Sequence, residues 1–220
     1  MTSGPALLFD LDGTLVDTDH LHHAAFVTIL AERGRELSLA EYRAHIMGGP
    51  NDAILARYFP DEDAAILDRK EAMFRDALSA SVEPLPGIHP LLDWAEEYAI
   101  GCAVVTNAPR PNALAMLAAA GLARRLPVLV IGEECARPKP DPAPYRAAKA
   151  ALGATPTRAL AFEDSRSGLR AARAAGAHVF GMTTGLVPEE LLQAGAHQTI
   201  ADFTDPVLWT RLDQLRTRVA

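Results

Sequence analysis

The chain alternates short, continuous apolar runs with helical patterns, and this alternation limits its fold more than any other feature. Unbroken apolar runs are typical of strands buried on both faces of a parallel sheet. They lie at Ala6–Phe9, 102–105, 127–131, 159–162 and His178–Met182, with a weaker run at 199–200. Helical patterns lie between them at 88–98, 111–120, 143–152 and 165–175. Glycines at 121, 153 and 176 follow the last three, where a helix favours glycine. The sequence therefore predicts an α/β fold with a doubly wound, Rossmann-like parallel sheet.

One stretch interrupts the alternation, from residue 18 to about residue 80. It contains no convincing strand, and helical patterns occur at 18–33, 38–47, 51–58 and 62–79. The chain then continues through Glu83-Pro84-Leu85-Pro86-Gly87, a stiff connection suited to a hinge. We expect residues 17–83 to form an inserted α-helical cap, and residues 1–16 and 84–220 to form the α/β core.

Composition narrows the class of protein. Of 220 residues, 49% are hydrophobic, enough for a sizeable core, and 22% are charged. The formal net charge of −7 argues against nucleic-acid binding. No apolar run approaches the roughly 18 residues of a membrane-spanning helix, and no signal-peptide pattern is present. Two cysteines are too few for a disulfide scaffold. We expect a cytoplasmic protein without a membrane partner, either a monomer or a small homo-oligomer.

Polar side chains gather at the ends of the predicted strands. Asp10 and Asp12 follow the first strand, Thr106-Asn107 the second, and Glu163-Asp164 the fourth. Lys139 follows the third, between two prolines. In open α/β sheets, ligands bind beyond the carboxyl ends of the strands. We therefore expect four carboxylates, a hydroxyl, an amide and a lysine at one edge.

Such a cluster of carboxylates requires positive charge. At ~4 Å and an effective dielectric constant of about 20, each like-charge pair costs about 4 kcal/mol. Oxygen ligands with open coordination positions suit Mg²⁺, which keeps several waters and accepts phosphate oxygens from a substrate. The site is thus arranged for metal-assisted attack on an anionic substrate.

The residue types at this edge suggest separate roles in phosphoryl transfer. Asp10 can act as a nucleophile, since aspartates form acyl-phosphate intermediates. Asp12 is close enough to protonate a leaving oxygen and later to deprotonate water. Thr106 and Lys139 can bind the non-bridging oxygens as negative charge develops on them.

Four segments resemble, in order, the signatures of the haloacid-dehalogenase-like superfamily. They are Phe9-Asp10-Leu11-Asp12-Gly13-Thr14-Leu15-Val16-Asp17-Thr18, Val105-Thr106-Asn107, Lys139 within Lys-Pro-Asp-Pro, and Phe162-Glu163-Asp164-Ser165. The resemblance spans the whole chain. It implies a nucleophile at Asp10, an acid/base at Asp12, and Thr106 and Lys139 as holders of the phosphoryl group. It also implies Mg²⁺ on Asp10, the Asp12 carbonyl and Asp164, with Glu163 as a direct or more distant ligand.

Asp12 discriminates within this superfamily. The dehalogenases and the transport ATPases lack a carboxylate at its position, which leaves the phosphatases and phosphomutases. The chain looks like the branch of phosphoglycolate phosphatase and β-phosphoglucomutase. We expect a Mg²⁺-dependent phosphatase for a small phosphomonoester, such as a sugar phosphate or a phosphoglycolate-like compound, acting through an aspartyl-phosphate. Asn107, His22 and Asn51 are candidate substrate-binding residues.

Other interpretations stay open. A β-phosphoglucomutase-like sugar phosphomutase is the main alternative, although Gly48-Gly49-Pro50-Asn51-Asp52 lacks the arginine that such mutases carry there. A non-catalytic phospholigand sensor is a remote one. A calcium loop beginning at Asp10 is disfavoured because its twelfth position is Leu21. His20 and His23 have the spacing of a zinc face, but no second ligand pair is evident.

Overall fold

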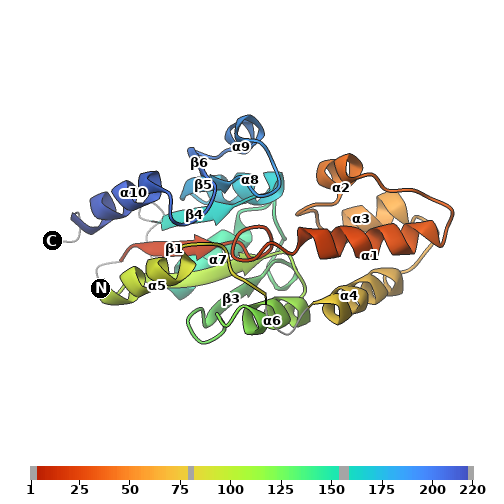
Figure 1. The fold of residues 1–220 in the computed structure, drawn as a ribbon, viewed down its shortest axis with the longest axis horizontal. Coiled ribbons are helices and arrows are strands. Elements are labelled where there is room, and N and C mark those ends of the chain that lie inside the picture. The colour runs from red at the N-terminus through yellow and green to blue at the C-terminus, as the bar shows by residue number, and fades with distance from the viewer. Residues whose placement is uncertain (1–3, 79–81, 154–158, 218–220) are drawn as a thin grey trace.

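A computed structural model describes residues 4–78, 82–153 and 159–217. Within these residues, six strands form one fully parallel sheet in the order β3-β2-β1-β4-β5-β6 (Figure 1). The strands are β1 (Ala6–Phe9), β2 (Gly101–Thr106), β3 (Val128–Ile131), β4 (Ala159–Glu163), β5 (His178–Met182) and β6 (Gln198–Ile200). The chain winds outwards from β1 in one direction and then from β4 in the other. The predicted doubly wound fold is confirmed.

Helices cover both faces of the sheet. They are α5 (Ile88–Glu97), α6 (Arg110–Ala119), α7 (Ala143–Ala151), α8 (Arg166–Ala174), α9 (Pro188–Ala194) and α10 (Pro206–Thr217), with a 3₁₀ turn at Gly132–Glu134. Residues of α5, α6 and α10 pack with Leu7 and Phe9 of β1. Residues of α7, α8 and α9 pack with Ala6 and Leu8. Successive strand residues thus face opposite helical layers. The sequence patterns did not predict α9 or α10.

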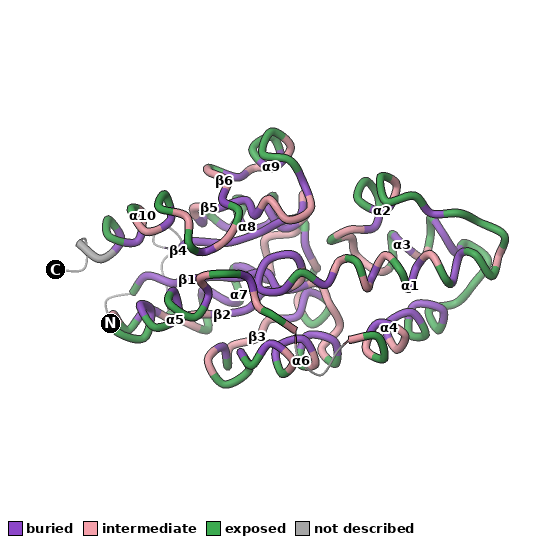
Figure 2. The backbone as a smooth tube through the Cα atoms, viewed as in Figure 1, coloured by how far each residue is buried: buried purple, intermediate pink, exposed green. Residues whose placement is uncertain are grey.

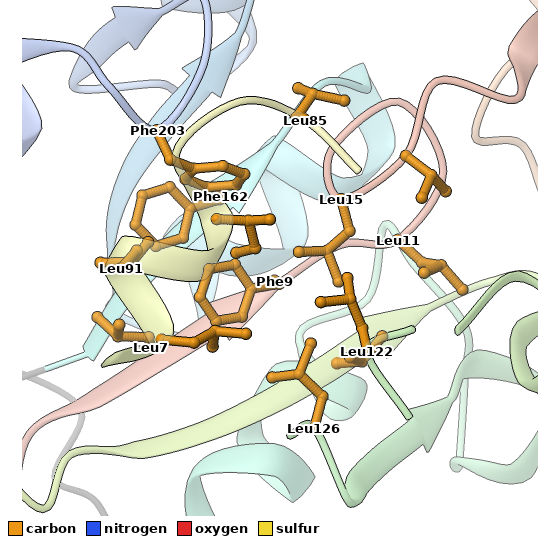
Figure 3. Close-up of a cluster of buried hydrophobic side chains, with 14 of the residues drawn as sticks. Leu7, Phe9, Leu11, Leu15, Leu85, Leu91, Leu122, Leu126, Phe162 and Phe203 are labelled. Carbon is orange, nitrogen blue, oxygen red and sulfur yellow. The ribbon is translucent and has the colours of Figure 1, made fainter. Parts of the chain in front are cut away.

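Aromatic rings fill the core beneath α5 and α10. The rings of Phe9 and Phe162, on adjacent strands, are stacked with centroids 5.0 Å apart, and Phe203 meets both rings edge-on (Figure 3). All three side chains are fully buried. Because Phe9 immediately precedes Asp10, and Phe162 immediately precedes Glu163 and Asp164, this packing fixes the strand ends that carry the carboxylates.

Four helices extend beyond the carboxyl edge of the sheet (Figure 1). They are α1 (Asp19–Ala31), α2 (Leu39–His45), α3 (Asn51–Tyr58) and α4 (Ala65–Ala77). Their inner residues form a separate hydrophobic cluster that includes Phe26, Ile29 and Ile54. Figure 2 shows that their buried faces point towards one another and their outer faces are exposed. The last residue of the predicted 62–79 helix, with its neighbours 80 and 81, lies outside the described residues.

None of the helices in the described part of the chain combines the length and the apolar character needed to cross a membrane.

Candidate active site

Lys139 connects two buried carboxylates at the carboxyl edge of the sheet. Its Nζ lies 2.5 Å from Asp10 Oδ1, at the end of β1, and also contacts Glu163 Oε1 on β4. Lys139 and Glu163 are almost fully buried. Burial lowers the pKa of Lys139, but Asp10 and Glu163 outweigh it and the net shift is upwards. The lysine therefore stays charged beside Asp10.

Glu163 is held from two further directions. The Tyr145 hydroxyl on α7 donates to Glu163 Oε1 at 2.5 Å, and Ser165 Oγ donates to Oε2 at 3.2 Å. A Cβ on Gly168 would lie within about 2 Å of this carboxylate, so only glycine fits there. The sequence analysis missed Tyr145. Its inward place in the first turn of the helix after Lys139 is the signal that could have identified it.

Asp10, Glu163 and Asp164 each offer an oxygen to one cluster, and these oxygens lie within 4.8 Å of one another. Burial raises the pKa of Asp10 to about 8, and Glu163 adds to the effect. Burial, followed by the charge of Asp10, raises the pKa of Asp164 well above its usual value. Gly13, at φ +74°, lets the loop pass Asp164, because a Cβ would lie 2.3 Å from its Oδ2. Lys139 supplies one positive charge to these three buried carboxylates, and the remaining negative charge on oxygen donors fits a small divalent cation such as Mg²⁺.

The carboxylate of Asp12 is bound to α1 and is not part of that cluster. Its Oδ1 accepts from the Thr18 hydroxyl, and its Oδ2 lies 2.8 Å from His22 Nε2. Lys70 Nζ on α4 lies 2.6 Å from His22 Nδ1. Because the lysine donates to Nδ1, the Nε2 proton of His22 points at Asp12. Burial opposes ionisation of Asp12, but His22 and Thr18 together lower its pKa below the usual value.

Thr106 is the last residue of β2 and Asn107 follows it, and both line the pocket. The Thr106 hydroxyl accepts from the Ala108 N–H at 3.0 Å. The Asn107 amide is engaged on both sides, since it donates to the Lys139 carbonyl and accepts from the Lys139 N–H, each at 3.1 Å. Asn107 therefore fixes the backbone that carries Lys139.

These residues line one cavity, whose volume accessible to the centres of water molecules is about 90 Å³. We call its sheet side the core wall, formed by Asp10, Asp12, Thr106, Asn107, Ala108, Pro109, Lys139, Asp164 and Ser165. We call its helical side the cap wall, formed by Asp19, His22, Phe26, Tyr42, Ile46, Met47, Gly48, Gly49, Asn51, Ile54, Lys70 and Glu71. The predicted residues His22 and Asn51 both lie on the cap wall.

Asp19 and Tyr42 form a polar pair on the cap wall that the sequence analysis did not identify. The Tyr42 hydroxyl donates to Asp19 Oδ1 at 2.9 Å. Burial raises the pKa of Asp19 to about 7, and the nearby charge of Asp12 contributes.

The cap wall also touches the core directly. Ser167 Oγ on α8 donates to the Gly48 carbonyl, and Arg166 Nη1 donates to the Arg43 carbonyl at 3.3 Å. A Cβ on Gly48, at φ +65°, would lie 2.5 Å from Ser165 Cβ. Glycine is therefore required for this close approach. Ser165 also caps α8 by accepting from the Gly168 N–H at 3.1 Å.

The model of the haloacid dehalogenase-like hydrolase family matches residues 7–182, from β1 to the end of β5. The chain belongs to this family. The resemblance predicted from the four signature segments is thereby confirmed. Relatives named as phosphatases, together with the family match, make it a hydrolase of phosphoric monoesters.

The alignments with similar proteins extend over most of this chain. Protein CbbY of Rhodobacter capsulatus is 34% identical, over 92% of this chain and 93% of its own. Validoxylamine A 7'-phosphate phosphatase of Streptomyces hygroscopicus subsp. limoneus is 30% identical, over 93% and 96%. A crystal structure of a CbbY variant from Rhodobacter sphaeroides with xylulose-(1,5)bisphosphate has a TM-score of 0.79 and 31% identity, over 91% and 95%.

Proposed function

We propose that this hydrolase is a Mg²⁺-dependent phosphatase that cleaves a small phosphomonoester, a sugar phosphate or a phosphoglycolate-like compound, through an aspartyl-phosphate on Asp10. One observation carries the proposal. The Asp10 carboxylate lies at the pocket floor, bound to Lys139 and clustered with Asp164, while Asp12 stands two residues further on. Nucleophile, cation, metal donors and acid/base thus converge on one cavity.

In the first half-reaction an Asp10 oxygen attacks phosphorus, and the bond from phosphorus to the leaving oxygen breaks. Asp12 gives its proton to that oxygen, so the alcohol leaves neutral. In the second half-reaction water attacks phosphorus and Asp12 takes a proton from that water. The bond from phosphorus to the Asp10 oxygen breaks, which frees inorganic phosphate and restores the Asp10 carboxylate.

Lys139 and Thr106 would hold the transferred phosphoryl group. Glu163 holds the Lys139 ammonium and Asn107 holds the Lys139 backbone, so the ammonium meets the substrate already oriented. Asp10 and Asp164 would hold Mg²⁺, with Glu163 adjacent and the Asp12 carbonyl as the ligand that the family resemblance implies. When bound, the ion supplies positive charge that offsets the carboxylates and the phosphate oxygens.

The helical segment would act as a cap. We assign residues 17–83 to it, and residues 1–16 and 84–220 to the α/β core. In the closed arrangement His22 reaches Asp12 from α1, and Gly48 rests on α8. Closure would exclude bulk water and complete the acid/base arrangement.

The direct test is capture of the phosphoryl group on Asp10. Acid-quenched turnover, followed by mass spectrometry, should place one phosphoryl group on the peptide containing Asp10 in the wild type. Asp10→Asn should show none, and Asp68→Asn, a change at an exposed position on α4, should behave as wild type. Phosphorylation of another residue, or turnover by Asp10→Asn, would contradict the proposal.

A further inference from the structure

We infer that the cap wall selects substrates whose leaving group is an uncharged polyhydroxylated chain or ring, with neither a carboxylate nor a second phosphate. This inference rests on the proposed phosphatase function and narrows its substrate class. The argument depends on the charges that the cap wall presents once its internal contacts are counted.

The cap wall has no uncommitted cation among the described residues that line the pocket. Counting only residues that the structure describes, the lysine of this wall is Lys70 and no arginine lines the cavity. Lys70 Nζ lies 2.6 Å from His22 Nδ1 and 3.1 and 3.2 Å from the two oxygens of Glu71. Three contacts use the three N–H groups of an ammonium. The Phe26 ring lies 4.7 Å away on another side. Lys70 is therefore neutralised within the wall and offers nothing to an anionic substrate.

Asp19 is the cap-wall carboxylate whose side-chain hydrogen bond is to a neutral group rather than to a cation. Glu71 is paired with Lys70 and also accepts from Asn112 Nδ2 at 2.6 Å. Asp19 has instead a neutral partner, the Tyr42 hydroxyl. Two basic groups act on Asp19 from a distance: Arg43, which is exposed and does not line the pocket, and Lys70, whose N–H groups are already engaged. A carboxylate or phosphate on the leaving group would face Asp19 without a matching cation, and like charges brought together oppose binding.

The N-terminus of α3 is a feature of the cap wall that could attract an anion. Asn51 at its first position lines the pocket. However, Asp52 follows in the same turn, and its Oδ1 accepts from the Ala53 N–H at 2.8 Å. The positive end of this helix already has an acidic partner.

The remaining contacts suit hydroxyl groups on a carbon skeleton. Asp19 can accept from a hydroxyl, and the Asn51 amide can both donate and accept. Ile46, Met47 and Ile54 line the pocket as apolar surface for C–H groups. The crystallised relative holds a bisphosphate, whereas this wall fits a monophosphate.

The experiment compares kcat/KM within substrate pairs that differ chiefly in charge away from the reacting phosphate. The pairs are glucose 6-phosphate with 6-phosphogluconate, fructose 1-phosphate with fructose 1,6-bisphosphate, and glycerol 1-phosphate with 3-phosphoglycerate. We expect the wild type to favour the uncharged member of each pair by about 100-fold. Asp19→Asn keeps an acceptor for Tyr42 and should narrow the ratio at least about tenfold, by raising turnover of the anionic members. Asp68→Asn should leave the ratio unchanged.

Equal turnover of both members by the wild type would overturn the inference. So would a preference that Asp19→Asn leaves unchanged, because the selecting charge would then lie elsewhere. p-Nitrophenyl phosphate separates this failure from failure of the proposed function. If p-nitrophenyl phosphate is hydrolysed with Mg²⁺ but the substrate pairs show no charge preference, only the inference about the cap wall fails. If no compound releases phosphate, both the inference and the proposed function fail.

Discussion

The core wall and the cap wall border the same cavity but are built in different ways. The core wall holds its groups on strand ends that are fixed by a buried sheet, with Asp10 after β1 and Asp164 after β4. The cap wall carries its groups on helices that have their own small core. We therefore expect the core wall to hold its groups more rigidly than the cap wall does.

The largest expected effect concerns Asp12, the proposed acid/base residue, which His22 of the cap wall contacts. Asp12→Asn should lower kcat for alkyl phosphates about 1,000-fold, since neither protonation of the leaving group nor deprotonation of water remains. With p-nitrophenyl phosphate, whose leaving group needs no proton, the variant should give a burst of nitrophenol and then stall. Stopped-flow absorbance measures the burst. A kcat within tenfold of the wild-type value would show that turnover does not depend on the Asp12 carboxylate.

Two buried lysines, Lys139 on the core wall and Lys70 on the cap wall, provide a matched comparison between the walls. Lys139→Met leaves Asp10 and Glu163 unpaired and should reduce the free energy of unfolding by about 3–5 kcal/mol. Lys70→Met leaves Glu71 its bond from Asn112 and should cost only about 2 kcal/mol, with kcat reduced roughly tenfold through the loss of the donor to His22. Urea unfolding and steady-state kinetics measure both effects, with exposed Arg69→Met as the control. Equal destabilisation by the two variants would contradict the proposed difference in rigidity.

The smallest expected effect is on the pH dependence of stability, and it concerns a histidine of the core that differs in its surroundings from His22. His22 of the cap is held between Lys70 and Asp12, whereas His178 of the core is half-buried beside Gln198 and His197. Burial lowers the pKa of His178 from 6.5 to about 4. Between these values the unfolded chain binds a proton that the folded chain does not, so His178 reduces stability as the pH falls through this window.

His178→Gln should therefore lose less stability than wild type between pH 7 and pH 5, by roughly 1 kcal/mol or less after solvent screening. Urea midpoints at the two pH values measure the difference. Identical pH dependence in both proteins would show that His178 is not responsible.

The two walls also differ in how far they could be predicted from the sequence. Parallel topology brings the carboxyl ends of the strands together. The sequence alone therefore placed four residues at that edge of the sheet, namely Asp10, Thr106, Lys139 and Asp164. The fold class was predicted correctly from the alternation of strand and helix patterns, and the family from the four signature segments.

The cap wall was largely missed because helical periodicity does not show which faces of separate helices meet. Lys70 lies in a charged stretch that looks solvent-exposed, yet it is buried against Glu71 and Phe26. Tyr42 and Asp19 lie on different helices whose pairing depends on three-dimensional packing.

Asn107, on the core wall, was predicted as a substrate ligand, while its amide is engaged with the Lys139 backbone.

The most direct test of the central claim is phosphate release from metabolite phosphomonoesters by the wild type and by Asp10→Asn, each with Mg²⁺ and with excess EDTA. The account predicts release only by the wild type and only with the metal, because the carboxylate cluster requires a cation and Asp10 carries the phosphoryl group. Undiminished release in EDTA, or steady release by Asp10→Asn, would contradict it.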